Sequence, residues 1–303
     1  MENIGNNTLV YKYTLDNEYP PPMIQYSPVR WIAFVVSALF PLLAARVLAV
    51  ARATRSPWLC AAGVAPLLLF IALVLRGATG QEDGDAFRMY QAQMVLHLCA
   101  GFVLVGMLLV FAAEWIEIER RAVVGVFLRH AGIGYTVAAA LCTCVGFPLA
   151  FDEAEGRRIS GYRLVSAALV LSIVMAVLSG TLAVYHVDER RHGGAAAAQR
   201  LAVIVLPAVL LAGWMAFALA RMSLPMGNVA NTSDALFYCL SVLPAMGVLI
   251  VWTGLGEEFL VAEANVADGI PAKECSCATR ARTEPCGACS HEASLQRAMQ
   301  KYA

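Results

Sequence analysis

Six polar side chains, within or at the ends of three long apolar segments, are the residues of this chain best suited to bind a ligand. They are Tyr90, Gln93, His97, Arg221, Asp234 and Tyr238. Ionisable groups are costly to place at membrane depth and often mark a functional site. They predict a pocket, lined by helices, that holds a small molecule through a few polar contacts. The alternative interpretation is structural: Arg221 and Asp234 lie in water near the membrane surface, and His97 donates a hydrogen bond to a neighbouring helix.

The nine cysteines form a second group of candidate residues. Five of them lie in apolar segments, where a thiol is a small apolar filler. The other four precede His291 in the C-terminal segment and are Cys275, Cys277, Cys286 and Cys289. Four thiolates suffice for a tetrahedral zinc site, and cysteines near an inner leaflet are candidates for S-acylation. Reduced, unligated thiols are the third interpretation, and the three stay open.

Other kinds of chemistry are not indicated by the sequence. The three lysines are Lys12, Lys273 and Lys301, so no apolar segment carries the amine that a retinal Schiff base needs. The motifs of phosphate-binding loops, zinc proteases and nucleophile elbows are absent. Lysine plus arginine and aspartate plus glutamate number 22 each, so no basic excess favours nucleic acid. We expect no enzymatic activity, no cofactor and no nucleic-acid partner.

The apolar residues that surround these candidates predict a membrane protein. Hydrophobic residues make up 59% of the 303 residues and charged residues 15%, against about 45–50% and 25% in soluble domains. A spanning helix needs about 20 mostly apolar residues. Seven segments meet this requirement: 31–50, 57–75, 92–113, 131–150, 164–185, 201–220 and 236–255. We predict an all-α, polytopic bundle of seven transmembrane helices.

The same pattern divides the chain into three parts. We expect an extracytoplasmic N-terminal tail over 1–30, a transmembrane domain over 31–255 and a cytoplasmic, cysteine-containing tail over 256–303. The N-terminal tail is polar and lacks the pattern of a cleaved signal peptide. The first span is therefore expected to act as the insertion signal and to be retained.

The orientation follows from lysine and arginine in the loops and tails. With the N-terminus outside, 14 of these residues fall on the inner side and 8 on the outer side. Two glycosylation sequons, at Asn6 and Asn231, then both fall outside. We expect the N-terminus outside and the C-terminus in the cytoplasm, in the plasma membrane or an endomembrane.

Small and polar residues repeat at helical spacing in four of the spans. Because lipid gives helices no hydrophobic reason to associate, such stripes are predicted to face neighbouring helices. The stripes are Tyr90, Gln93, His97 and Gly101; His130, Gly134, Ala138, Cys142 and Gly146; Ser172, Ala176, Ser179, Ala183 and His186; and Asp234, Tyr238, Ser241 and Ala245. Four prolines inside spans, Pro41, Pro66, Pro207 and Pro244, permit kinks.

The sixth and seventh spans carry a family resemblance. They contain Leu206-Pro207, then Met226-Gly227-Asn228-Val229, then Phe237-Tyr238 followed by Leu243-Pro244-Ala245-Met246. This pattern resembles fungal seven-span integral membrane proteins of an uncharacterised family, allied to the RTA-like lipid-translocating exporters. The exporters carry an arginine pair in span six and an acidic residue before span seven. Here these residues are incompletely present: only Arg221 and Asp234 could stand in for them, and the arginine of the uncharacterised family in span six is missing.

The resemblance implies handling of a lipid or a lipophilic small molecule. Few charged groups lie within the spans, which suits an apolar cargo better than an ion. The expected partners are therefore membrane lipids and a lipophilic ligand. A seven-helix receptor or sensor with a cytosolic signalling tail, and a non-catalytic membrane scaffold, are the alternatives.

Overall fold

The computed structural model describes residues 30–54, 57–78, 86–118, 122–152, 154–189, 195–223 and 233–254. The chain divides into two compact units, Met1–Thr253 and Gly254–Ala303. All described residues except Gly254 belong to the first unit. The predicted tails, the cysteines at 275–289 and the sequons at Asn6 and Asn231 lie outside the described residues.

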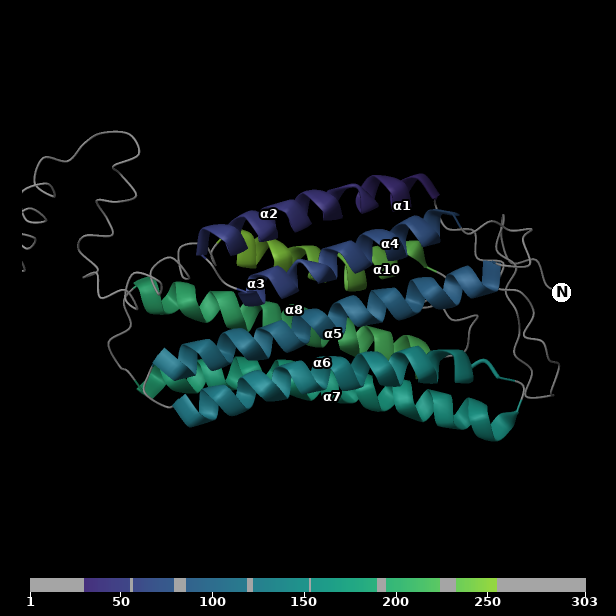
Figure 1. The fold of residues 1–303 in the computed structure, drawn as a ribbon. Coiled ribbons are helices and arrows are strands. Elements are labelled where there is room, and N and C mark those ends of the chain that lie inside the picture. Colours follow the sequence, from purple (N-terminus) through teal and green to yellow (C-terminus); the bar gives the residue numbers. More distant parts are fainter. Residues whose placement is uncertain are drawn as a thin grey trace, which may run out of the picture. The chain divides into compact units, whose positions relative to one another are not determined.

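The prediction of an all-α bundle with seven membrane-spanning helices is confirmed: the described residues contain seven helices long and apolar enough to cross a membrane (Figure 1). The first span comprises α1 (Arg30–Ser37) and α2 (Leu39–Thr54), and the second comprises α3 (Pro57–Ala62) and α4 (Val64–Ala78). Spans three to six are α5 (Ala86–Ile118), α6 (Ala122–Leu149), α7 (Glu155–Glu189) and α8 (Ala195–Ser223). The seventh comprises α10 (Asp234–Phe237), the π-helix η1 (Tyr238–Val242) and a helical stretch over 243–254.

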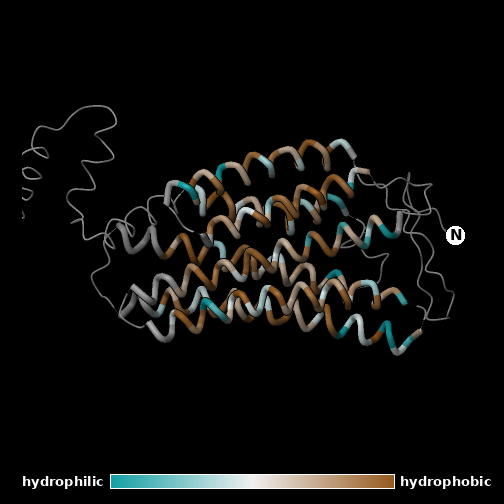
Figure 2. Tube along the Cα trace, in the orientation of Figure 1, coloured by the Kyte–Doolittle hydropathy of each residue, from teal (hydrophilic) through white to brown (hydrophobic). Residues whose placement is uncertain are grey.

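Several helices are longer than the apolar segments that predicted them. α6 begins at Ala122 and α7 at Glu155, about nine residues before the predicted spans. Backbone hydrogen bonding within a helix does not end at the hydrocarbon boundary, whereas the apolar composition does. Hydrophobic residues run along the helices in Figure 2, and hydrophilic ones lie mainly near the ends.

Prolines account for the irregular turns in three spans. A proline cannot donate a backbone hydrogen bond to the carbonyl four residues earlier. Pro41 follows the break at Ala38 between α1 and α2, and Pro66 follows the break at Gly63 between α3 and α4. Pro244 follows η1, where the N–H of Leu243 donates to the carbonyl of Tyr238, five residues earlier. α8, by contrast, continues through Pro207.

The third span, α5, is the central helix of the bundle. It contacts α4, α6, α7 and α8, and its Phe111 packs edge-on against Trp252 of the seventh span with ring centroids 4.9 Å apart. In its most apolar part 78% of the residues are buried, against 28% in the first span, which lies at the periphery. The predicted stripe on α5 faces inward, because Gln93, His97 and Gly101 are all buried.

The predicted inward stripe on α6 is wrong for most of its length. His130, Gly134 and Ala138 are exposed, and a Cβ atom added to Gly134 would meet nothing within 4 Å. The face that packs against α5 carries Gly132, where an added Cβ would lie 2.9 Å from the carbonyl oxygen of Gly106. Both faces of α6 carry small residues, so their spacing does not identify the packed one.

The predicted stripes on α7 and on the seventh span are confirmed where the structure describes them. Ser172, Ala176, Ser179 and Ala183 of α7 are buried, and so are Ser241 and Ala245. The side chain of His186 lies outside the described part of α7. Ser172 accepts a 2.6 Å hydrogen bond from the hydroxyl of Tyr135 of α6 and donates to the carbonyl of Ala168. Polar groups on this face are therefore paired within the bundle.

Candidate functional site

Four spans bring their polar residues together at the end of the bundle where α1 begins. Successive spans cross the bundle in opposite directions, so the end of α4, the start of α5, the end of α8 and the start of α10 meet there (Figure 1). Gly77, near the end of α4, packs against the ring of Phe34 of α1. We call the group of side chains at this end the arginine–aromatic cluster. Its members are Arg76, Tyr90, Gln93, His97, Trp214, Arg221, Asp234, Phe237 and Tyr238.

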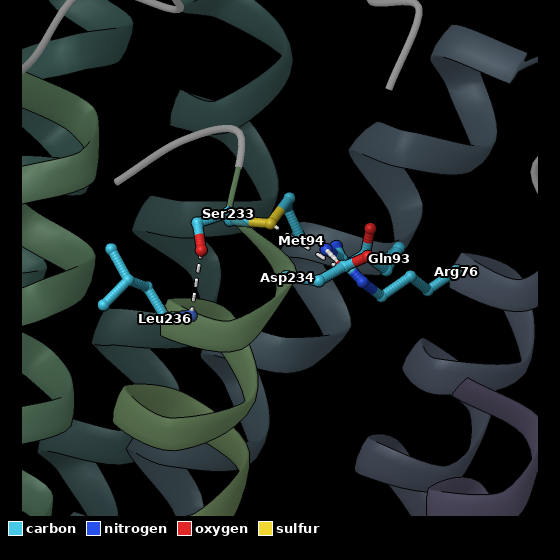
Figure 3. Close-up of polar contacts among 6 residues, drawn as sticks. All are labelled: Arg76, Gln93, Met94, Ser233, Asp234 and Leu236. Atoms are coloured by element: carbon cyan, nitrogen blue, oxygen red, sulfur yellow. Dashed lines mark hydrogen bonds and ion pairs between the residues drawn. The ribbon is translucent and has the colours of Figure 1, made fainter. Parts of the chain in front are cut away.

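An ion pair joins α4 to α10 within the cluster (Figure 3). Nη2 of Arg76 donates to Oδ1 of Asp234 at 2.8 Å, and the two side chains are 3% and 17% exposed. Asp234 lies in the first turn of α10, where the helix dipole favours a carboxylate. Ser233 caps the same helix, its hydroxyl accepting from the N–H of Leu236 at 3.3 Å. The cap and the ion pair together fix the start of the seventh span.

The ring of Phe237 lies at the centre of the cluster. The guanidinium carbon of Arg76 is 4.0 Å from the ring centroid and that of Arg221 is 5.6 Å away. The imidazole of His97 has its centroid 5.0 Å from the same ring. A guanidinium over an aromatic face contributes about 0.5 to 2 kcal/mol, more where water is excluded. Phe237 therefore couples side chains from α4, α5 and α8.

His97 is the most unusual group in the cluster. Its side chain is 2% exposed, and neither ring nitrogen has a hydrogen-bond partner among the described residues. The neighbouring Trp214 is fully buried, with the ring centroids 4.9 Å apart, and its indole N–H also lacks a partner within the described part of the chain. A buried polar group without a partner costs about 1–3 kcal/mol. Two such groups side by side are an arrangement that a bound polar group would stabilise.

All six residues predicted to form a ligand site belong to this cluster. Tyr90 lies near both arginines, and Tyr238 lies near Arg76. Gln93 is buried on the stripe of His97, and its amide contacts the sulfur of Met94 at 3.7 Å (Figure 3). Arg221 is buried, which contradicts the interpretation that it lies in water.

Three members of the cluster are absent from the predicted site: Arg76, Trp214 and Phe237. Arg76 ends an apolar segment, and the sequence gives no local sign that it turns into the bundle. The available signal is a pairing of opposite charges: Arg76 lies near the end of the second span and Asp234 begins the seventh, so the four crossings between them place both at the same end of the bundle. Trp214 and Phe237 look like ordinary apolar residues until the polar groups around them are known.

The other candidate residues are not brought into this site. Cys275, Cys277, Cys286, Cys289, Asn6 and Asn231 lie outside the described residues, so their chemistry stays a prediction. The five cysteines of the spans have free thiols. Three of these cysteines, Cys60, Cys144 and Cys239, are exposed on the bundle surface instead of filling its interior.

Comparisons with protein-family models, with curated proteins and with solved structures find no match for this chain. The resemblance in spans six and seven therefore stays a prediction.

Proposed function

We propose that this multi-pass membrane protein binds and translocates a lipid or a lipophilic small molecule, and that the arginine–aromatic cluster receives the polar end of that ligand. The observation that carries the proposal is the pair of buried, unpartnered groups on His97 and Trp214. A ligand with a polar end and an apolar body would satisfy these groups and leave its body among the apolar side chains of the bundle.

The character of the bundle supports an amphiphilic ligand. The polar residues of the cluster lie toward one end, whereas the helix surfaces beyond it are rich in exposed apolar side chains such as Leu141, Val174 and Val209. This distribution matches a molecule that enters from the membrane with its polar end directed toward the cluster. The proposal assigns the chain a binding and transport function without catalysis, in the same class as the exporters that spans six and seven resemble.

The experiment compares two histidine variants in purified protein reconstituted in lipid nanodiscs and in liposomes. Bound lipids are identified by native mass spectrometry, and translocation is followed with fluorescent phospholipid and fatty-acid analogues. His97→Ala is expected to lower binding about tenfold or more, which corresponds to about 1.4 kcal/mol. His130→Ala is the matched control, because this histidine is exposed on α6.

The proposal fails if the wild-type protein retains and moves no lipid beyond the level of protein-free membranes. It also fails if His97→Ala binds and moves lipid as the wild type does. A ligand that instead changes the accessibility of the C-terminal tail without being moved would identify a sensor, the main alternative.

We also propose that the cluster faces the extracytoplasmic side, with the N-terminus outside and the C-terminus in the cytoplasm. The excess of lysine and arginine on the predicted inner side supports this orientation. In glycosylating cells, a mobility shift removed by glycosidase and lost in Asn6→Gln would agree with it. A C-terminal tag detected on intact, unpermeabilised cells would contradict it.

A further inference from the structure

We infer that the ligand carries an anionic head group, a carboxylate or a phosphate, on an apolar chain. The inference rests on the proposed function and specifies the class of amphiphile that the cluster receives. Three features carry it: the charges gathered around Phe237, the hydrogen-bonding groups of His97 and Trp214, and the distances that place them together.

The charges of the cluster favour an anion. Its members include two guanidinium groups and one carboxylate, and both arginine side chains are buried. The guanidinium carbons lie 4.0 Å and 5.6 Å from the centroid of one ring, that of Phe237, so two like charges share a small region of low polarity. An anion placed there would be attracted by both, and the attraction is stronger than in water because the surroundings are less polar. A cationic head group would be repelled by both.

The hydrogen-bonding groups favour an acceptor. The indole N–H of Trp214 is only a donor, and a neutral imidazole offers one donor and one acceptor. The two unpartnered side chains therefore present more donors than acceptors, and the nearby arginines present donors only. A carboxylate or phosphate accepts several hydrogen bonds at once. An ammonium offers no acceptor, and a hydroxyl has no charge to interact with the guanidinium groups.

The packing brings these donors to one place. The rings of His97 and Trp214 have centroids 4.9 Å apart, and those of His97 and Phe237 are 5.0 Å apart. Gly101, one turn along α5 from His97, leaves room for two side chains of α8: an added Cβ would overlap the methyl group of Met215 and lie 3.3 Å from the ring of Trp214. An oxyanion next to His97 is therefore close to the indole of Trp214 and to the ring of Phe237, near which both guanidinium groups lie.

The experiment offers the nanodisc-embedded protein four amphiphiles that share one apolar chain: oleic acid, oleyl phosphate, oleyl alcohol and oleylamine. It is done at about pH 8, well above the ordinary pKa of a carboxyl group near 4 and below that of an amine near 10. Native mass spectrometry of the equimolar mixture measures the amount of each probe that is bound. We expect the anionic probes to be enriched at least tenfold over the alcohol and the amine, and the more enriched one identifies the head group.

Two variants test the named groups, and a third is the control. Trp214→Phe removes the indole N–H and keeps an aromatic ring, and Arg221→Gln removes one positive charge. Both are expected to reduce the enrichment of the anionic probes at least threefold. Arg157→Gln is the control for charge, because its side chain is exposed and pairs with Asp152 outside the cluster.

The possible outcomes separate this inference from the proposed function. Equal binding of all four probes, or a preference for the alcohol or amine, overturns the anionic head group and leaves lipid binding in place. Binding of none of them overturns both. Enrichment of the anionic probes that is unchanged in Trp214→Phe and Arg221→Gln places the anion site elsewhere and overturns the inference.

Discussion

Arg76 and Asp234 are 158 residues apart in the chain, yet their side chains form a 2.8 Å ion pair inside the bundle. The pair connects the end of the second span to the start of the seventh. Because both side chains are largely buried, neither charge is well hydrated once its partner is removed. The ion pair therefore makes the position of α10 depend on α4.

Removal of one partner of this pair is predicted to destabilise the bundle. Asp234→Asn leaves the guanidinium of Arg76 without its carboxylate, and we expect a loss of about 3 kcal/mol in the free energy of unfolding. The measurement is denaturant- or SDS-induced unfolding in mixed micelles. The double variant Arg76→Leu with Asp234→Leu is expected to lose less than either leucine variant alone, since no charge is left buried.

The control for this prediction is Asp152→Asn. Asp152 pairs with Arg157 at 3.2 Å, but that arginine is 66% exposed. Loss of such a surface ion pair costs about 1 kcal/mol or less. Equal losses of unfolding free energy in Asp234→Asn and Asp152→Asn would show that the buried pair of Arg76 and Asp234 contributes no more to stability than the surface pair.

The imidazole of His97 is predicted to serve ligand binding at a cost to stability. His97→Phe keeps a ring against Trp214 and Phe237 and removes two buried nitrogens without partners. We expect the free energy of unfolding to stay within about 1 kcal/mol of the wild type or to rise, while lipid binding falls about tenfold. The two readouts are thermal unfolding in detergent and native mass spectrometry in nanodiscs. An unstable variant that still binds lipid would assign His97 a structural role.

Two glycines of α6, two residues apart, are predicted to respond differently to the same substitution. Gly132→Ala places a methyl group 2.9 Å from the carbonyl oxygen of Gly106 and forces α5 and α6 apart, at a cost of about 1–3 kcal/mol. Gly134→Ala meets nothing within 4 Å and should be neutral or stabilising by up to about 1 kcal/mol, since alanine favours helix more than glycine. Unfolding in SDS titrations distinguishes the two, and equal losses would contradict the packing of α5 on Gly132.

The π-helical turn of the seventh span is predicted to tolerate a deletion that other helices do not. A π-turn holds one residue more than an α-turn, so deletion of the exposed Leu240 restores an α-helix and keeps Phe237 and Ala245 on the inner face. Deletion of the exposed Val177 from α7 rotates all later residues of the helix by about 100° about its axis. Ser172 and Ser179 then no longer lie on the same face. Size-exclusion profiles in detergent should show a folded monodisperse protein only for the first deletion. Aggregation of both variants would contradict the prediction.

The seven spans could be predicted from the sequence because the membrane sets a simple requirement of length and apolar composition. Even the fourth span, whose mean hydropathy is the lowest of the seven, forms a continuous helix. The inward face of α6 could not be predicted in the same way. In a membrane both faces of a helix are apolar, and small residues at Gly132 and Gly134 point to opposite sides.

Only part of the candidate site could be predicted from the sequence, because some of its residues are recognisable alone and others only through their neighbours in the bundle. Polar residues such as His97 and Asp234 are rare in spans and are recognisable one at a time. Arg76 becomes a site residue only through Asp234, and Phe237 only through the charges around it. Such pairings between distant spans depend on how the helices pack. The sequence of a single span does not show which residues of other spans will lie beside it.

The central place of α5 has a consequence for the biogenesis of the protein. During synthesis this helix emerges third, while the aromatic rings that pack against its buried His97, Trp214 of α8 and Phe237 of α10, are made last. Until then its polar face has to be shielded by the insertion machinery or by chaperones. Nascent chains that stop before the seventh span should be recognised as orphans and degraded.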